Sequence, residues 1–417
     1  MTLRSDHISV LAALALSVGI IAGIALPAGS GWDFANFYDA GHKAAAGQIQ
    51  DLYNPAATIE GKRAEAELPY WGTPLSAFLL APLAWMQPSR AMVIFKIQNT
   101  AALLLGLWLL YRYHSRFAVE NGFSREQYRA AFLVAALLFQ PFWTVYRVGG
   151  QTTPTIFLGL VLAMICFTSG RYLAAAICMV AVVTIKPAFI LMFVFLTAIA
   201  GLRFLGFVVV AGAVAGGASL LITGWSLHQR FLERLGTGWI SPWFFNSSLT
   251  VIFDNLRGIA GHDEPWFGAA SIMIRGTAGL VVIAGLVSSR RCAWSDEARR
   301  HFKFSMAIAF GLLLMPIVWE HYLAMLFVPL SYLLAVVRRI GRPAQTLLLL
   351  ICAFCATQNV VLVMWLRTHL NNHVGWVLVS TALFKSAPLL LFTLLLWWQR
   401  KRWSGVYEIK SWVRELS

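Results

Sequence analysis

The chain has 417 residues, of which 59% are apolar and 12% are charged. Globular domains carry about 25% charged residues, so a soluble globular protein is excluded. A formal charge of +15 can indicate nucleic-acid binding, but apolar runs of about 20 residues, each long enough to span a bilayer, recur along the sequence. The sequence predicts an all-α polytopic membrane protein with its basic residues in cytoplasmic loops and no nucleic-acid partner.

The predicted crossings follow from the apolar runs and from basic tracts, which stay cytoplasmic. The first run, 8–28, is longer than the ~7–15 residues of a signal-peptide core, so it is predicted to be an uncleaved first helix. Four basic tracts are predicted to be cytoplasmic: 112–129, 290–303, 338–342 and 400–402. They predict 12 crossings with both termini inside, the other spans lying near 91–111, 130–148, 152–169, 172–186, 187–201, 203–223, 269–289, 302–318, 322–337, 344–366 and 374–398.

The segments between the spans complete a single membrane domain over residues 1–417. The loop 30–73 is rich in acidic residues and is predicted to face outward, as is the segment 224–268, whereas the tail 399–417 is predicted to be cytoplasmic. The run from Pro74 to Gln87 would break this order as a full span. It is therefore predicted to be a re-entrant or half-depth segment, which is tolerated where it packs in protein or lines a wet cavity.

The most informative segment follows the first span. Phe34, Phe37, Tyr38 and Gly41 recur there at helical spacing, which predicts a short amphipathic helix in the outer interface. Asp33 stands at its entry. A carboxylate at that position can cap the helix or carry chemistry, and residue type alone favours neither.

Several motifs occur in a recognisable order. The string D-F-x-x-F-Y-x-A-G at 33–41 is followed by G-x-x-x-x-L-Y-N-P at 47–55 and P-L-x-x-x-L-L-A-P-L at 74–83. Later segments include G-Q at 150–151, I-K-P at 185–187, Asn-Ser at 246–247 and P-I-V-W-E-H-Y at 316–322. Over about its first 340 residues the chain resembles glycosyltransferase family 87, membrane enzymes of the C-type superfamily that use polyprenyl-phosphate sugars.

The resemblance implies a C-type glycosyltransferase fold and an inverting sugar transfer that needs a base and cationic donors for the departing phosphate. Asp33 matches the catalytic aspartate of the family. His321 matches the family's W-x-H and would donate to the phosphate, the plain alternative being an interfacial histidine. Lys186 interrupts an apolar run, where a cation costs at least ~2.5–3.5 kcal/mol; phosphate binding is favoured over snorkelling to the headgroups.

Four further residues are weaker candidates. Arg147 is a second candidate phosphate ligand because a guanidinium suits phosphate oxygens, with headgroup contact as the alternative. Gln151 and Asn246 are expected to hydrogen-bond sugar hydroxyls or to satisfy loop backbone. Trp71 is a candidate for stacking on sugar.

The sequence contains no D-x-D motif of the kind that holds a metal on a nucleotide diphosphate. We therefore expect no metal and no cofactor. The predicted function is a hexosyltransferase, mannose being the favoured sugar, that acts at the outer face of a bacterial cytoplasmic membrane on a lipid or glycan acceptor. The alternative is a transporter or flippase for lipid-linked sugars, which would also need intramembrane cations and broken helices.

Overall fold

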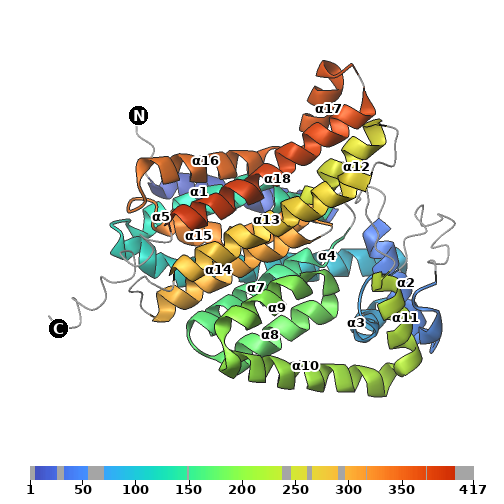
Figure 1. Cartoon of the computed structure of the whole chain (residues 1–417). Coiled ribbons are helices and arrows are strands. Elements are labelled where there is room, and N and C mark those ends of the chain that lie inside the picture. The colour runs from blue at the N-terminus through green and yellow to red at the C-terminus, as the bar shows by residue number, and fades with distance from the viewer. Residues whose placement is uncertain are drawn as a thin grey trace.

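The protein is a bundle of helices (Figure 1). The computed structural model describes residues 5–25, 32–54, 70–147, 150–236, 246–260, 265–289, 296–315, 317–371 and 373–399. Within these ranges every regular element is helical, and one isolated antiparallel bridge joins Asn246 to Trp319. The predicted all-α class is confirmed.

Four helices are each long and apolar enough to cross a membrane: α1 (Ser5–Ala25), α4 (Pro88–Glu120), α10 (Leu202–Thr223) and α18 (Val374–Gln399). The 33 residues of α4 span about 50 Å at 1.5 Å per residue, more than the ~30 Å hydrocarbon core. The helix therefore continues into the basic tract that begins at residue 112, so the first part of that predicted loop is helical.

Two predicted spans are bent pairs of helices. The span at 130–148 consists of α5 (Arg125–Leu138) and α6 (Gln140–Arg147), which meet at 49°. Pro141 lies in the first turn of α6, where it removes a backbone donor and favours the break. The span at 344–366 consists of α16 (Arg342–Ala356) and α17 (Asn359–His369), bent by 89°. The described helices give four spans, or up to six if each bent pair counts as one, and the 12 crossings stay a prediction.

The other predicted spans correspond to helices that are not among these four candidate spans or two bent pairs. They are α7 (Thr153–Thr168), α8 (Tyr172–Ile185), η3 (Pro187–Phe189), α9 (Ile190–Ala200), α13 (Pro265–Ser289), α14 (Asp296–Leu314), η4 (Glu320–Leu326) and α15 (Phe327–Ala335).

The predicted outer segments are also largely helical. The first holds α2 (Trp32–Ala45) and η1 (Ile49–Asp51), and the long segment holds α11 (Trp225–Gly236) and α12 (Leu249–Ala260). The run after Pro74 forms α3 (Pro74–Leu80) and η2 (Ala81–Trp85). Its 12 residues make about 18 Å of helix, too short to cross the bilayer core.

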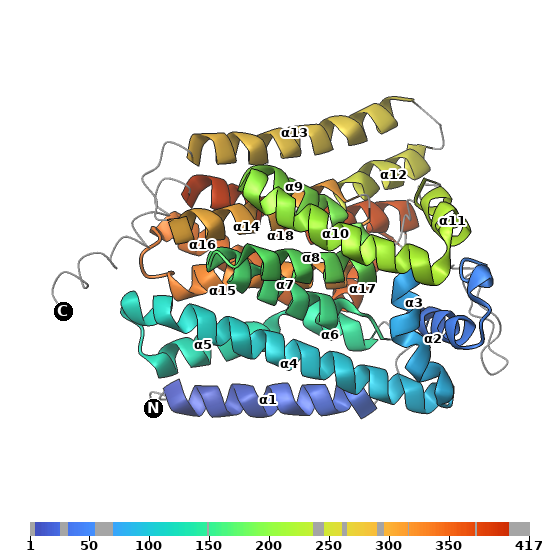
Figure 2. The same cartoon turned by 90° about the horizontal axis from the view of Figure 1, so that it is seen from below.

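The two ends of the bundle differ. The start of α1 and the end of α18 lie together at one end, and α2, α3 and α11 gather at the other (Figure 2). Basic residues tie the first end together: Arg129 pairs with Asp6 at 3.3 Å, and Arg338 donates to the Gly122 carbonyl. This end carries the described residues of three of the tracts predicted to be cytoplasmic, 112–129, 296–303 and 338–342, and the candidate site lies at the other.

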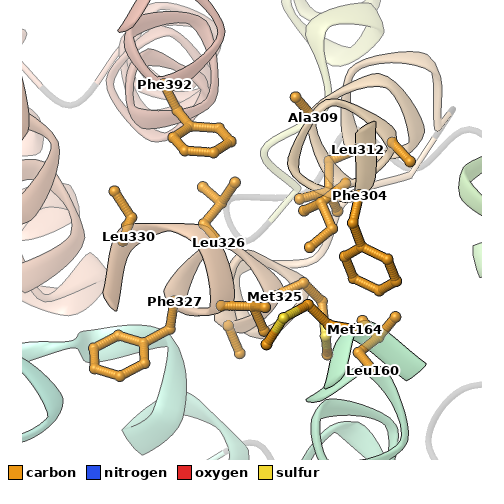
Figure 3. Close-up of a cluster of buried hydrophobic side chains, with 14 of the residues drawn as sticks. Leu160, Met164, Phe304, Ala309, Leu312, Met325, Leu326, Phe327, Leu330 and Phe392 are labelled. Carbon is orange, nitrogen blue, oxygen red and sulfur yellow. The ribbon is translucent and has the colours of Figure 1, made fainter. Parts of the chain in front are cut away.

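The centre of the bundle is built around η4 and α15. Met325, Leu326, Phe327 and Leu330 project from this segment among side chains of α7, α14 and α18 (Figure 3). All seven residues of η4 are buried. The start of this segment carries the predicted histidine, so the hydrophobic core holds one side of the site in place.

Candidate active site

The helix α2 is fixed by packing on neighbouring protein. Phe34 and Phe37 are buried and lie 5.5 and 5.8 Å from the Phe95 ring of α4. A Cβ atom at Gly41 would approach the Leu80 carbonyl oxygen to 2.5 Å, so only glycine allows this contact with α3. The predicted helix is present, but protein rather than lipid covers the face that carries these residues.

Asp33 lies in the first turn of α2 and is half-buried. The side chain of Gln151 hydrogen-bonds its carboxylate, and the charge of Lys186 lies close enough to attract it. Burial raises the pKa of Asp33 above its ordinary range, and the lysine and the hydrogen bond oppose part of this rise. A carboxylate with a raised pKa is a stronger base than an exposed one.

The loop that carries Gln151 depends on a glycine. Gly150 has a φ of +87°, a conformation that other residues rarely adopt. A Cβ atom there would lie 3.2 Å from the Phe34 Cβ, so the loop passes close against α2. This explains why glycine and glutamine occur together here. Gly150 lets the loop backbone approach α2, and the Gln151 side chain then reaches Asp33.

Lys186 is the residue at which α8 ends. Its backbone is extended, with φ −138° and ψ 90°, and Pro187 begins the following 3₁₀ turn. The Thr73 hydroxyl donates to the Thr184 carbonyl at 2.6 Å, which ties the start of α3 to this break. The I-K-P motif thus interrupts the apolar helix where the lysine faces Asp33.

The third side of the site comes from η4. Lys186 hydrogen-bonds Tyr322, and its Nζ lies 5.5 Å from the centre of that ring. The neighbouring His321 is buried and lies within electrostatic reach of Lys186. The structure therefore brings Asp33, Gln151, Lys186 and His321 together from four separate segments of the chain.

Several buried polar atoms around this cluster have no hydrogen-bond partner in the described part of the chain. They are Gln151 Oε1, Thr152 Oγ1, Ser247 Oγ and His321 Nε2. Buried polar groups in native proteins are nearly always hydrogen-bonded. Two of these atoms belong to residues that face Asp33 or Lys186, as expected for a site whose substrate supplies the missing partners.

Asn246 has a structural task. Its side-chain oxygen accepts hydrogen bonds from the backbone N–H groups of Ser248 and Val318, both at 3.0 Å. This interaction accompanies the bridge to Trp319, one residue before η4. Of the two alternatives for this residue, the structure favours satisfaction of the backbone over sugar binding.

Two other candidates lie at the margin of the cluster. Trp71 precedes the Thr73 that caps α3, and the Arg234 guanidinium lies 5.1 Å from the centre of its ring. One face of the indole is therefore already covered by a cation. Arg147 ends α6, but its side chain lies outside the described part of the structure.

An apolar cavity of about 770 Å³ adjoins the cluster. Residues of α8, α9 and α10 line most of it, with His228 and Phe231 of α11 at its border. Its wall also includes Thr73 and Thr184, the pair that is hydrogen-bonded beside Lys186. The cavity therefore runs along the apolar helices α8, α9 and α10 and reaches Thr184, two residues before Lys186.

The sequence analysis missed two features. Tyr322 is assigned no role by the sequence, although its phenol can hydrogen-bond the Lys186 ammonium beside it. Lys385 was overlooked inside the last apolar run, yet it forms a buried ion pair with Glu320 at 2.9 Å. A lysine within a span and a glutamate beside His321 were the available signals.

No group of three or more metal-binding side chains gathers among the described residues. The charged group that faces Asp33 there is the Lys186 ammonium and not a second carboxylate. This arrangement suits an anionic ligand better than a cation, because lysine and histidine donate hydrogen bonds to phosphate oxygens.

Comparison with known proteins identifies one family. The family model described as glycosyltransferase family 87 matches residues 70–316, more than half of the chain. The matched part includes Gln151 and Lys186, whereas Asp33 lies well before it and His321 shortly after it. No protein with a curated description matches the chain.

Proposed function

The chain belongs to glycosyltransferase family 87, and from this premise we propose that it transfers a hexose, mannose being the favoured sugar, from a polyprenyl phosphate to a lipid or glycan acceptor. The observation that carries the proposal is the meeting of Asp33, Lys186 and the His321–Tyr322 pair, close to an apolar cavity whose wall includes Thr184, two residues before Lys186. A polyprenyl-phosphate donor needs an apolar cavity for its hydrocarbon chain and, next to it, a cationic group for its phosphate.

The proposed reaction is an inverting displacement. The acceptor hydroxyl oxygen attacks the anomeric carbon while the bond from that carbon to the phosphate oxygen breaks. Asp33 takes the hydroxyl proton, and the polyprenyl phosphate leaves with the bonding electrons. A positioned base of this kind contributes about 10²–10⁴ to the rate.

Lys186 links the two halves of the reaction. Its charge lowers the pKa of Asp33, which weakens the base when no donor is bound. A donor phosphate at Lys186 would neutralise this charge, so the basicity of Asp33 would rise as the donor arrives. His321 and Tyr322 provide further hydrogen-bond donors for the phosphate, whose negative charge grows as it departs.

The predicted location is the outer face of a bacterial cytoplasmic membrane, with the bilayer as the solvent of the donor chain. Support comes from the end of the bundle at which α2 and α3 lie, opposite the end that holds Arg129 and Arg338. Positive residues stay on the cytoplasmic side. A tag fused after residue 399 that is accessible only from outside the cell would contradict this orientation.

The direct test uses purified protein in lipid nanodiscs. Polyprenyl-phosphate mannose labelled in the sugar is added together with a membrane extract, and the labelled product is identified. The proposal expects a new mannosylated lipid or glycan and the release of polyprenyl phosphate. Labelled donor that only crosses the bilayer of a sealed vesicle, without release of polyprenyl phosphate, would instead support the transporter alternative.

A further inference from the structure

A buried ion pair lies behind the site, outside the residues that the family model matches. The Lys385 ammonium lies 2.9 Å from Glu320 Oε1, and the two side chains are 2% and 1% exposed. Lys385 is near the middle of α18, and Glu320 begins η4. A lysine so deeply enclosed does not reach the lipid headgroups, so its role lies inside the protein.

The pair is part of a fully bonded junction between four elements. The second oxygen of Glu320 accepts a hydrogen bond from the Thr144 hydroxyl of α6 at 3.1 Å. Lys385 also donates to the Thr357 carbonyl at the end of α16, at 2.6 Å. The Glu320 carboxylate is thus bonded to both Thr144 and Lys385, and the Lys385 ammonium is bonded to both Glu320 and Thr357.

The residues held by this junction are those that meet Lys186. His321 and Tyr322 follow Glu320 directly in the tight 3₁₀ turns of η4, so a shift of Glu320 shifts both. Buried ion pairs contribute little to stability compared with a well-packed apolar pair, and their best-documented use is to specify one arrangement. Met325 and Leu326 of η4 pack among apolar side chains (Figure 3), and such contacts set its depth less strictly than a charged bond does.

We propose that Lys385 is a positioning residue for the transfer reaction, holding Glu320 so that His321 and Tyr322 face Lys186. This inference rests on the proposed function of that site. Lys385 also keeps the Glu320 carboxylate occupied.

The test separates positioning from stability. Lys385→Met leaves a buried carboxylate unpaired and is expected to lower both the melting temperature and kcat. The double variant Glu320→Gln/Lys385→Met removes both charges and is expected to regain most of the melting temperature, with kcat still at least about tenfold below wild type, since misplacement by 1 Å can cost ~10² in rate. Recovery of kcat to the wild-type level in the double variant would overturn the proposal.

A matched control pair lies at the opposite end of the bundle. Arg116 of α4 pairs with Glu297 of α14, far from the residues that meet Lys186. The double variant Arg116→Met/Glu297→Gln is expected to change the melting temperature little, because a partly exposed ion pair contributes little to stability, and to leave kcat and the donor KM near wild type. An equal loss of kcat in both double variants would overturn a specific role for Lys385.

A second measurement does not need the donor. Structures of the wild type and of Glu320→Gln/Lys385→Met, both without substrate, are compared after superposition of α8. The proposal expects His321 and Tyr322 to shift relative to Lys186 by more than about 0.5 Å, the tolerance of a preorganised site. A smaller shift would overturn it. Absence of mannosyl transfer by the wild type would refute the proposed function alone, because this comparison would still decide whether Lys385 positions η4.

Discussion

Two carboxylate–lysine pairs lie on either side of η4, and they are built differently. Glu320 and Lys385 are in direct contact at 2.9 Å, fully buried and saturated with hydrogen bonds. Asp33 and Lys186 attract each other without a direct ion pair among the described contacts, and Lys186 shares its interactions with Tyr322. The Glu320–Lys385 pair is therefore locked, with no capacity left for another ligand. The Asp33–Lys186 pair is open, because either side chain can still bind a substrate group.

The difference separates structural from reactive groups. A catalytic base must become free of its cationic neighbour when the donor binds. That cation, in turn, must be available to bind the donor phosphate. The open pair meets both needs and adjoins unsatisfied polar atoms. The locked pair meets neither, so its burial indicates a role in holding the fold of the site.

Removal of the reactive cation should have a large effect on rate and a small one on stability. Lys186→Met is expected to lower kcat/KM by about 10²–10³, the usual loss for one electrostatic donor in an active site. Its melting temperature should stay close to wild type, in contrast to Lys385→Met. Donor titrations and thermal unfolding in the same detergent provide the measurement. A loss of kcat/KM below about tenfold would remove Lys186 from the phosphate site.

The cavity should affect donor binding and not the chemical step. A Cβ atom at Gly216 or at Gly206 meets no atom within 4 Å, and only Gly216 lines the cavity. Gly216→Trp is expected to raise the donor KM several-fold with kcat nearly unchanged, the signature of lost uniform binding. Gly206→Trp, on the same helix, is the control. Equal KM values for the two variants would contradict the assignment of the cavity to the donor chain.

The pH dependence should report the surroundings of Asp33. Transfer needs the deprotonated carboxylate, so activity falls on the acid side as the pH drops through its pKa. Lys186 and Gln151 both lower that pKa, and their removal therefore moves the acid limb to higher pH. Profiles of kcat/KM for wild type and Gln151→Leu test this sign, and a shift to lower pH would contradict it.

Chelation should have no effect. The Lys186 ammonium can balance charge on a lipid monophosphate, and His321 and Tyr322 can donate hydrogen bonds to it, so full activity is expected after dialysis against EDTA. Loss of transfer with EDTA and its return with magnesium or manganese would contradict the metal-independent reaction.

The predicted site residues that lie together in the structure are ones that a sequence motif marks, and their roles stay predictions. Asp33, Gln151, Lys186 and His321 each stand in a short motif, and the structure brings them together. Asn246 also stands in a motif, but its hydrogen bonds to backbone depend on Val318, 72 residues away. The Glu320–Lys385 pair joins residues 65 apart; a lysine inside an apolar run signals that a partner exists, but not which residue it is.

The fold was predictable in class and less so in detail. Apolar runs give the positions of helices, because a chain in lipid must satisfy its backbone internally. They do not reveal where a helix breaks, since the residues on both sides are equally apolar. The break beside Pro141 had a local signal, whereas the bend after Ala356 depends on packing and on the Lys385 bond to Thr357.

The most direct test of the account compares two aspartates on α2. Asp39 is already paired with Lys43 at 2.7 Å, and Asp33 is the carboxylate that faces the site. Asn is as good a helix cap as Asp, so Asp33→Asn should fold, insert and bind polyprenyl phosphate normally. We expect it to lose at least about 10²-fold in transfer rate, with Asp39→Asn keeping most of its activity. Transfer by Asp33→Asn at more than about a tenth of the wild-type rate would show that Asp33 is not the base.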